Sequence, residues 1–251
     1  MAAPDVSGNQ SEPELSGQTV VVIGGSAGIG LETARRARAE GADVILTGRN
    51  RERLERASAD LGALSSAAFD ALDAAALRRF FQDLPRQIDH VMVTAGGPYY
   101  ARLADLDRER AHRDFDEHVW LSIAIAQHAV GRIRPDGTLL FMGGTGGRKR
   151  GLGMSLMAAA TAAKPALIAN LALEIAPIRV NLIAAGFVDT PLSASLLGND
   201  LYQRRDELRA TLPIGRVVGP ADIAALAVHI MTNTALTGAT YDIDGGQQLI
   251  S

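Results

Sequence analysis

The stretch Thr19–Gly30, TVVVIGGSAGIG, constrains the fold more than any other part of the chain. Consecutive apolar residues run without polar alternation into a glycine-rich turn, and an alanine-rich segment typical of a helix follows. A strand that is apolar at every position is buried on both faces, which predicts a parallel sheet with helices on each side. The order of strand, glycine turn and helix start is also typical of a diphosphate site, where free N–H groups face the negative charge.

The glycine spacing alone leaves two interpretations open. Gly24, Gly28 and Gly30 follow the pattern G-x-x-x-G-x-G, which is related to the usual dinucleotide-binding fingerprint without being identical to it. A turn of this kind can also be a plain connection between a strand and a helix. The rest of the chain therefore has to decide whether the turn binds a ligand.

The remaining chain alternates between short apolar segments and longer amphipathic or alanine-rich ones. We predict strands at 20–23, 43–47, 67–69, 90–94, 138–142, 179–184 and 240–243, and helices at 31–39, 51–61, 73–82, 105–130, 155–176 and 220–232. This alternation indicates βαβ units, so the predicted fold class is α/β, a single Rossmann-type doubly wound domain. We expect residues 1–17 to form a flexible N-terminal tail. Residues 18–251 then form the domain, with a substrate loop near 192–212 that shows no clear pattern.

Composition excludes several classes of function. A chain of 251 residues with 47% hydrophobic content is long enough for one large domain. Its net charge of −3 gives no reason to expect nucleic acid or a membrane surface as a partner. Cysteine is absent, which excludes disulfides and thiolate chemistry. Neither a signal peptide nor a membrane-spanning segment is predicted, so we expect a cytoplasmic protein.

Residues at the carboxyl ends of the strands are the strongest candidates for a binding site, because open parallel sheets bind ligands beyond these ends. At the end of the second expected strand the chain reads Gly48, Arg49 and Asn50, with no carboxylate. An acid there would bind the 2′-hydroxyl of NAD, whereas an arginine accommodates the 2′-phosphate of NADP. We therefore predict NADP(H) as the preferred cofactor and NAD(H) as the alternative. Arg49 could also simply begin the charged helix that follows.

From about Gly17 to Ile250 the chain resembles the short-chain dehydrogenase/reductase superfamily. The similarity rests on GGSAGIG at 24–30, Asp70 after the third strand, TAG at 94–96, LALEIAPIRVN at 171–181, AGFVDTP at 185–191 and LTGATYDIDGG at 236–246. The resemblance implies a seven-stranded parallel sheet with helices on both faces, and nicotinamide chemistry. It also implies the roles of the cofactor-binding residues. These are Gly24, Ser26, Gly28, Ile29, Gly30, Arg49, Asp70 beside the adenine, Ala95, Gly96, and Val188 and Thr190 near the nicotinamide amide.

The family's four catalytic positions carry other residues in this chain. The family uses a tyrosine as general acid/base, a lysine four residues later on the same helix face, a serine that polarises the carbonyl, and an asparagine that holds a water relay. Aligned on LALEIAP, these positions fall on Met157, Thr161, Gly144 and His118, respectively. Methionine has no proton to donate, and the threonine hydroxyl is too short to replace the lysine. The usual proton transfer of the family therefore cannot run here.

Four side chains remain as catalytic candidates. Tyr99 and Tyr100 follow the fourth strand and carry phenols, His118 titrates near neutral pH, and Thr145 lies next to the serine position. Each has a structural alternative, namely aromatic packing for the tyrosines, a hydrogen-bonded structural histidine, and a turn-capping hydroxyl. The tyrosines are slightly preferred because they follow the strand end directly, whereas His118 needs a relay.

The sequence as a whole predicts an atypical NADP(H)-dependent oxidoreductase that acts on a carbonyl, an alcohol, or an activated C=C or C=N group. The alternative is a cofactor-binding homologue without turnover that serves as a regulatory or structural subunit. We expect a small-molecule substrate and no metal. The helix expected at 155–176 has almost no polar face. This predicts that a second copy covers it in a homodimer or homotetramer.

Overall fold

β1 (Thr19–Ile23) lies inside a seven-stranded sheet whose order is β3-β2-β1-β4-β5-β6-β7. The computed structural model, which describes residues 14–85, 87–148 and 150–250, pairs every neighbouring strand in parallel. The other strands are β2 (Asp43–Gly48), β3 (Ser65–Ala68), β4 (Ile88–Val93), β5 (Ile133–Gly144), β6 (Arg179–Ala185) and β7 (Thr240–Ile243). The predicted seven-stranded Rossmann-type sheet is confirmed.

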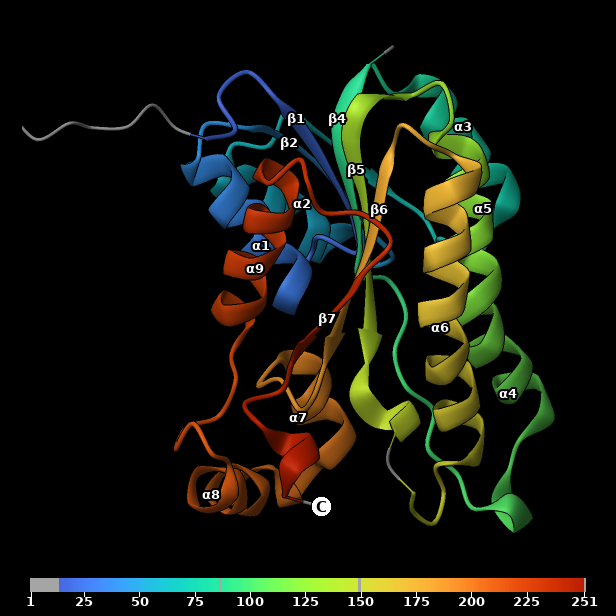
Figure 1. Ribbon diagram of the computed structural model, residues 1–251, viewed down its shortest axis with the longest axis vertical. Helices are drawn as coiled ribbons and strands as arrows, with labels where there is room; N and C mark the ends of the chain where they lie inside the picture. Colours follow the sequence, from blue (N-terminus) through green and yellow to red (C-terminus); the bar gives the residue numbers. More distant parts are fainter. Residues whose placement is uncertain (1–13, 86, 149, 251) are drawn as a thin grey trace, which may run out of the picture.

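Helices cover both faces of this sheet (Figure 1). On one face lie α1 (Gly28–Ala39), α2 (Arg51–Leu61) and α9 (Pro220–Thr232), and on the other α3 (Ala74–Asp83), α4 (Arg108–Phe115), α5 (Leu121–Ala129) and α6 (Ser155–Glu174). Beyond the carboxyl ends of the strands lie α7 (Pro191–Leu197) and α8 (Leu201–Thr211). Short turns complete the chain, namely η1 (Leu103–Asp105), η2 (Asp116–Trp120), η3 (Thr145–Arg148), η4 (Gly198–Asp200) and η5 (Gln247–Leu249).

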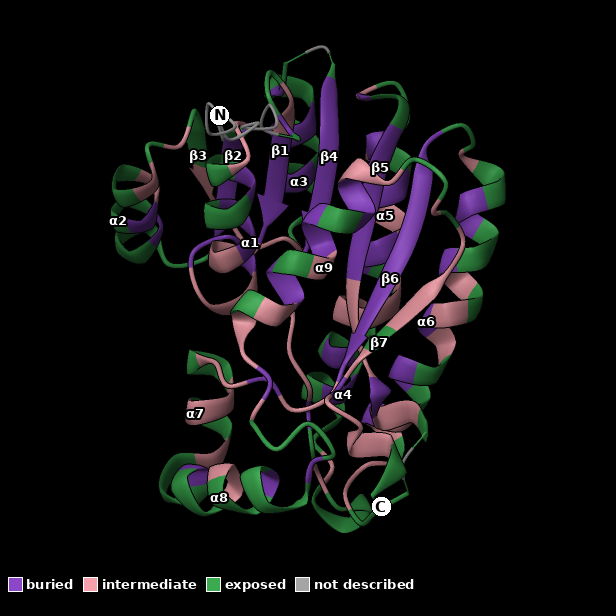
Figure 2. Ribbon diagram, turned by 60° about the vertical axis from the view of Figure 1, so that its left-hand side comes forward, coloured by how far each residue is buried: buried purple, intermediate pink, exposed green. Residues whose placement is uncertain are grey.

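The alternating side chains of β1 explain why the strand is apolar throughout. Val21 and Ile23 pack into the core beneath α3, α5 and α6, whereas Val20 and Val22 pack into the core beneath α1, α2 and α9. All four are fully buried, and Figure 2 shows the neighbouring strand β4 and, further along the sheet, β6 buried along their length. Since each face has its own hydrophobic core, a polar residue at any of these positions would lie in an apolar environment.

The strand order places the candidate site at one end of the sheet. From β1 the chain runs outward through β2 and β3, then returns to β4 on the other side of β1. The carboxyl ends of β1 and β4 therefore flank the point where the topology reverses, which is where doubly wound sheets bind ligands. Figure 1 shows α7 and α8 beyond this same end.

The expected helix over 105–130 is largely confirmed, since helical residues run without a gap from Arg108 to Ala129 and contain one π-helical turn. It consists of η1, α4, the π-helical turn η2 and α5. At η2 the ring Nδ1 of His118 bonds the main-chain oxygen of Asp114 at 2.8 Å, so a side chain takes an acceptor that a regular helix gives to a backbone N–H. π-Turns of this kind occur frequently at functional sites. Two predicted strands also shift, since β3 begins at Ser65 and β5 extends from Ile133 to Gly144.

The segment near 192–212 is helical, although its sequence shows no clear pattern. Thr190 caps α7 by accepting a hydrogen bond from the N–H of Ser193 at 3.2 Å, and Pro191 occupies the first turn. Both are ordinary signals for a helix start. Leu201 and Leu208 of α8 are buried, so this helix packs against the rest of the domain.

Two other expectations are modified by the structure. Of the predicted tail 1–17, residues 1–13 lie outside the described residues, but Leu15 is fully buried and its N–H donates to the oxygen of Glu40. Within the described ranges α6 is long and apolar enough to cross a membrane by length and composition, a test that core helices also pass, so this finding qualifies the sequence-based prediction without contradicting it. It packs against β5, β6 and η3, as a core helix does.

Candidate active site

The turn after β1 has the close backbone approach that its glycines predicted. Gly24 has φ +99°, and a Cβ there would lie 2.7 Å from the main-chain nitrogen of Ala95. The hydroxyl of Thr94 donates to the oxygen of Gly24 at 3.0 Å, which ties the end of β4 to the turn. A Cβ on Gly30 would overlap the oxygen of Gly24. These contacts fix the shape of the turn between the ends of β1 and β4.

The start of α1 has the features of an anion site. Its N-cap residue Ala27 makes no side-chain capping bond, and its first turn carries no acidic residue. The N–H groups of the first helical turn therefore face outward with the positive end of the helix dipole. Gly28 has φ +54°, and a Cβ on it would lie 3.5 Å from Cβ of Thr190. The space that a side chain would fill lies between this turn and the loop after β6, so these residues fit the diphosphate of a nicotinamide cofactor.

Two arginines lie at the outer end of the glycine turn. Ser26 is buried, and the space above Gly48 is so narrow that a Cβ there would lie 2.9 Å from the Ser26 hydroxyl. The guanidinium Nε of Arg53 donates to the same hydroxyl at 3.3 Å. Arg49 follows β2 directly and is exposed. Sequence reasoning missed Arg53, although its position one helical turn after Arg49 is a usable signal.

A chain of polar contacts links the ends of β3 and β4. Asp70 pairs with Arg113 at 2.7 Å, Arg113 reaches Glu117 at 3.2 Å, and Glu117 accepts the N–H of Gly97 at 3.1 Å. Burial raises the pKa of the Asp70 carboxyl, but the bond from Arg113 and further contacts outweigh it and leave the pKa below its usual value. This chain lies beside Gly96, where a Cβ would meet Glu117. It runs along the predicted adenine side of the site.

The remaining cofactor candidates lie where the fold brings strand ends together. Ala95 donates its N–H to the oxygen of Ile23 at 3.0 Å, which joins the ends of β4 and β1. Ile29 lies in the first turn of α1 and is half-buried. Val188 is buried after β6, close to the α7 cap at Thr190. The structure thus gathers the predicted cofactor residues along one path at the carboxyl end of the sheet.

The positions of the family's serine, tyrosine and lysine are filled by close packing of η3 on α6. Met157 and Thr161 are both buried on α6. A Cβ on Gly146 would overlap the Met157 methyl group, and one on Gly147 would lie 2.8 Å from a main-chain nitrogen of α6. The Thr161 hydroxyl donates to the main-chain oxygen of Met157 at 2.7 Å. Neither α6 side chain offers a proton to a substrate.

Gly144 and Thr145 end β5 next to this packed region. A Cβ on Gly144 would lie 3.6 Å from the Thr161 methyl group. Thr145 is buried at the start of η3. Its hydroxyl is therefore the one that follows β5 directly, beside the position that the family gives to serine.

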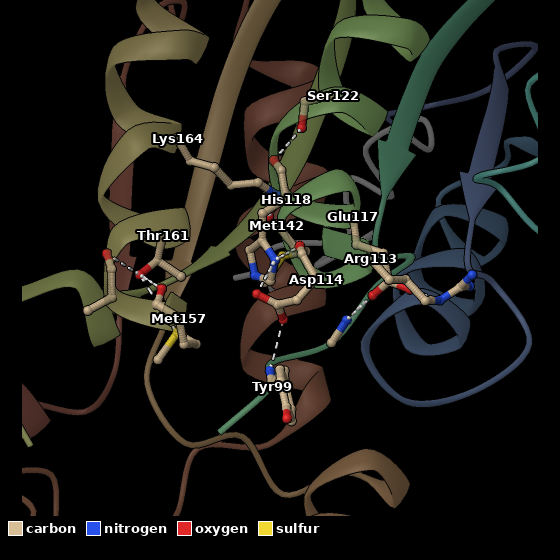
Figure 3. Close-up of polar contacts among 12 residues, drawn as sticks. Tyr99, Arg113, Asp114, Glu117, His118, Ser122, Met142, Met157, Thr161 and Lys164 are labelled. Carbon is tan, nitrogen blue, oxygen red and sulfur yellow. Dashed lines mark hydrogen bonds and ion pairs between the residues drawn. The ribbon is translucent and has the colours of Figure 1, made fainter. Parts of the chain in front are cut away.

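Lys164 does not take the place of the family's lysine. Its side chain is buried between α6 and β5, and Nζ donates to the main-chain oxygen of Met142 at 2.6 Å. Burial lowers the pKa of Lys164 to about 8. Figure 3 shows this side chain directed across toward the strand, away from Met157.

The structure separates the two tyrosine candidates. The Tyr99 hydroxyl accepts the N–H of Asp107 at 3.0 Å, and Arg110 lies over the ring at 4.5 Å from its centre. This phenol is part of the start of α4, and in Figure 3 it points away from His118 and α6. Tyr100 is half exposed. The pKa of its phenol is raised, mainly by the burial of the hydroxyl end and to a smaller extent by the negative charge of Asp114.

His118 lies between α4 and α6. Its Nδ1 is 2.8 Å from the main-chain oxygen of Asp114 and 3.7 Å from Oδ2 of that carboxylate. Asp114 accepts the N–H of Tyr99 through Oδ1, whereas Oδ2 is buried and has no hydrogen-bond partner among the described residues. Burial raises the pKa of the Asp114 carboxyl, and the charge of His118 opposes this effect. Sequence reasoning missed Asp114, four residues before His118.

Over residues 14–85, 87–148 and 150–250, no group of three histidine or acidic side chains is placed to hold a metal ion. The polar groups gathered at the site are the N–H groups at the start of α1, the two arginines, and the His118–Asp114 pair.

Comparison with known proteins agrees with this geometry. A family model described as enoyl-(acyl carrier protein) reductase matches residues 24–248. The short-chain dehydrogenase/reductase ATR9 of Stachybotrys chlorohalonatus is 29% identical over 257 residues, spanning 93% of this chain and 98% of that protein. The structure of the MalC reductase/Diels-Alderase from Malbranchea aurantiaca has a TM-score of 0.87 at 25% identity, and covers 96% of this chain and 100% of its own.

A second solved structure, BdcA in complex with NADPH, has a TM-score of 0.83 at 25% identity and covers 92% of this chain and 95% of its own. The family match extends over nearly the whole described domain, from the glycine turn to η5. The chain therefore belongs to the short-chain dehydrogenase/reductase superfamily, whose members are oxidoreductases that bind nicotinamide cofactors.

Proposed function

We propose that this protein is an NADP(H)-dependent oxidoreductase that reduces or oxidises a small molecule at a carbonyl, an alcohol, or an activated C=C or C=N group. The observation that carries the proposal is the pair Arg49 and Arg53 at the outer end of the glycine turn. Arg53 bonds Ser26 within that turn, and β2 ends without a carboxylate. Two guanidinium groups there favour a 2′-phosphate over a free 2′-hydroxyl.

The chain's own residues have separate parts in this function. When bound, the nicotinamide cofactor supplies or accepts the hydride. The N–H groups at the start of α1 bind the diphosphate, and the chain Asp70–Arg113–Glu117 borders the adenine side. Thr145, next to Gly144, would polarise the reacting group, and the loop before α7 would hold the nicotinamide amide through Val188 and Thr190.

The names of the relatives support turnover over the non-catalytic alternative. MalC is named a reductase, and BdcA was solved with NADPH. ATR9 carries the name of a dehydrogenase/reductase. The alternative of a cofactor-binding subunit without turnover rests on the replaced catalytic residues alone, and none of these names supports it.

Reversal of the charge at Arg49 tests the cofactor preference. We expect Arg49→Asp to weaken NADPH binding by about 10–100-fold, because a charge-assisted hydrogen bond contributes roughly 1.5–3 kcal/mol. NADH binding should stay within about threefold, since NADH carries no 2′-phosphate. Arg53→Ala should weaken NADPH binding in the same direction. Fluorescence titration with each cofactor gives the ratio of the NADPH and NADH dissociation constants.

Arg51→Asp is the matched control. Arg51 lies in the first turn of α2, two residues after Arg49, is largely exposed and pairs with Glu55 at 4.0 Å. It should leave the NADPH/NADH ratio unchanged. If Arg49→Asp also leaves the ratio unchanged, the assignment of NADP(H) is wrong.

The outer face of α6 suggests how the protein assembles. The exposed positions of α6 are mostly small, including Ala162, Ala166 and Ala169, and Leu173 is exposed near its end. A second copy in a homodimer or homotetramer would cover this face. We propose a cytoplasmic enzyme whose other partner is its small-molecule substrate, with no role for nucleic acid or membrane.

A further inference from the structure

We propose that His118, oriented by Asp114, donates the proton that the family takes from its tyrosine. The inference rests on the proposed function and adds the residue that completes its chemistry. Its starting point is the absence of a proton donor at the family's tyrosine and lysine positions on α6. Met157 has no proton to donate, and the Thr161 hydroxyl is bonded to the helix backbone. A donor must therefore come from another element near the same place.

The hydrogen bonds of His118 fix which nitrogen can act. A carbonyl oxygen only accepts, so the bond to the oxygen of Asp114 assigns the proton on Nδ1. Nε2 is then the nitrogen that gains and loses a proton, and it lies on the side of the ring away from Asp114. The π-turn η2 packs against α6, and Figure 3 shows the ring between Asp114 and the α6 residues Met157 and Thr161.

Asp114 is a positioning residue in this arrangement. Its carbonyl and one carboxylate oxygen both lie on the Nδ1 side of the ring, at 2.8 Å and 3.7 Å. The carboxylate oxygen Oδ2 is buried and has no other partner among the residues that the structure describes. A carboxylate at this place holds the ring in one orientation, as the third member of a nucleophile–base–acid group does.

The other charged groups around His118 are directed elsewhere. Lys164 of α6 donates to Met142, and Glu117 of η2 is bonded to Arg113 and to the N–H of Gly97. Arg110 of α4 lies over the ring of Tyr99. Asp114 is therefore the charged side chain that contacts the imidazole.

All protons and electrons of the proposed reduction are accounted for. In the reduction of a carbonyl, the new C–H bond takes its two electrons from the reduced nicotinamide, which becomes oxidised. The new O–H bond takes its proton from Nε2 of the His118 imidazolium, which becomes neutral imidazole and is protonated again by water. In the direction of alcohol oxidation, neutral Nε2 accepts the proton.

His118→Asn is the central variant, and His112→Asn is its control, because His112 is an exposed histidine on the adjoining helix α4. We expect His118→Asn to reduce NADPH-dependent turnover by about 10²–10⁴-fold, the usual contribution of a general acid. NADPH binding should stay within twofold of the wild type in both variants, and His112→Asn should keep full rate. Full rate in His118→Asn would overturn the proposal.

Histidine NMR gives a readout that does not depend on turnover. The Cε1–H signal of His118, identified by its loss in His118→Asn, should titrate with pH and move when NADP⁺ is added, whereas the His112 signal should not respond to NADP⁺. In Asp114→Asn, which can still accept the N–H of Tyr99, the response of the His118 signal to NADP⁺ should change because the carboxylate that orients the ring is lost.

The two proposals fail in different ways. A wild-type protein that binds neither NADPH nor NADH contradicts the proposed function. A protein that binds NADPH, but whose His118 signal neither titrates nor responds to NADP⁺, contradicts the role of His118.

Discussion

We expect Gly28→Asp to weaken cofactor binding strongly while the domain stays folded. An aspartate tolerates the positive φ of this position better than most residues, and its Cβ would be in ordinary contact with Thr190. Its carboxylate would then occupy the space at the start of α1 that we assign to the diphosphate. Because a like-charge contact of this kind costs several kcal/mol, we expect NADPH affinity to fall by about 100-fold or more. Isothermal titration calorimetry measures the loss.

Gly62→Asp controls for the backbone cost. Gly62 caps the far end of α2 with φ +62°, and a Cβ there would meet nothing within 4 Å. Both variants therefore pay a similar conformational cost, but Gly62 is not part of the site. If the two variants bind NADPH equally well, the glycine turn does not hold the cofactor.

Arg179→Leu should be the most destabilising of the single substitutions considered. The Arg179 guanidinium donates to the main-chain oxygens of Asp136, Ile230, Met231, Asn233 and Leu236 and to the Thr138 hydroxyl. Leucine would leave these acceptors unsatisfied at the end of α9. We expect a loss of about 3–5 kcal/mol, which lowers the melting temperature by roughly 10 °C or more in a domain of this size.

Arg216→Leu is the matched control for this prediction. Arg216 makes a bidentate pair with Asp222 at 2.7 Å, but its side chain is 59% exposed. Exposed pairs contribute at most about 1 kcal/mol, so its melting temperature should fall by only a few degrees. Calorimetric scans that show equal losses for both variants would contradict the role assigned to Arg179.

The parts of the fold that local pattern determines were predictable from the sequence. β1 is apolar on both faces because a core lies on each side, and the order of strand, glycine turn and helix start is visible in consecutive residues. The helix 51–61 and the strand 240–243 have the predicted bounds. In these segments propensity, periodicity and tertiary packing favour the same structure.

The parts that depend on particular side-chain contacts were not predictable. The π-turn at 116–120 within the expected helix 105–130, where His118 bonds the oxygen of Asp114, is not revealed by hydrophobic periodicity. The close packing of Gly146 on Met157 joins two segments through space. The sequence slightly favoured Tyr99 or Tyr100 over His118 as the proton donor. It could not reveal that the Tyr99 hydroxyl accepts the N–H of Asp107 at the start of α4.

The most direct test of the account is hydride transfer by the wild-type protein. The chain is incubated with NADPH deuterated at the reactive position of C4, in both stereochemical forms, and with a panel of ketones, imines and enones. Mass spectrometry then follows deuterium in the products. We predict transfer from one of the two forms, with NADPH preferred over NADH by at least about tenfold, as Arg49 and Arg53 require. A protein that binds NADPH tightly but transfers no deuterium to any substrate of the panel would contradict the assignment as an oxidoreductase.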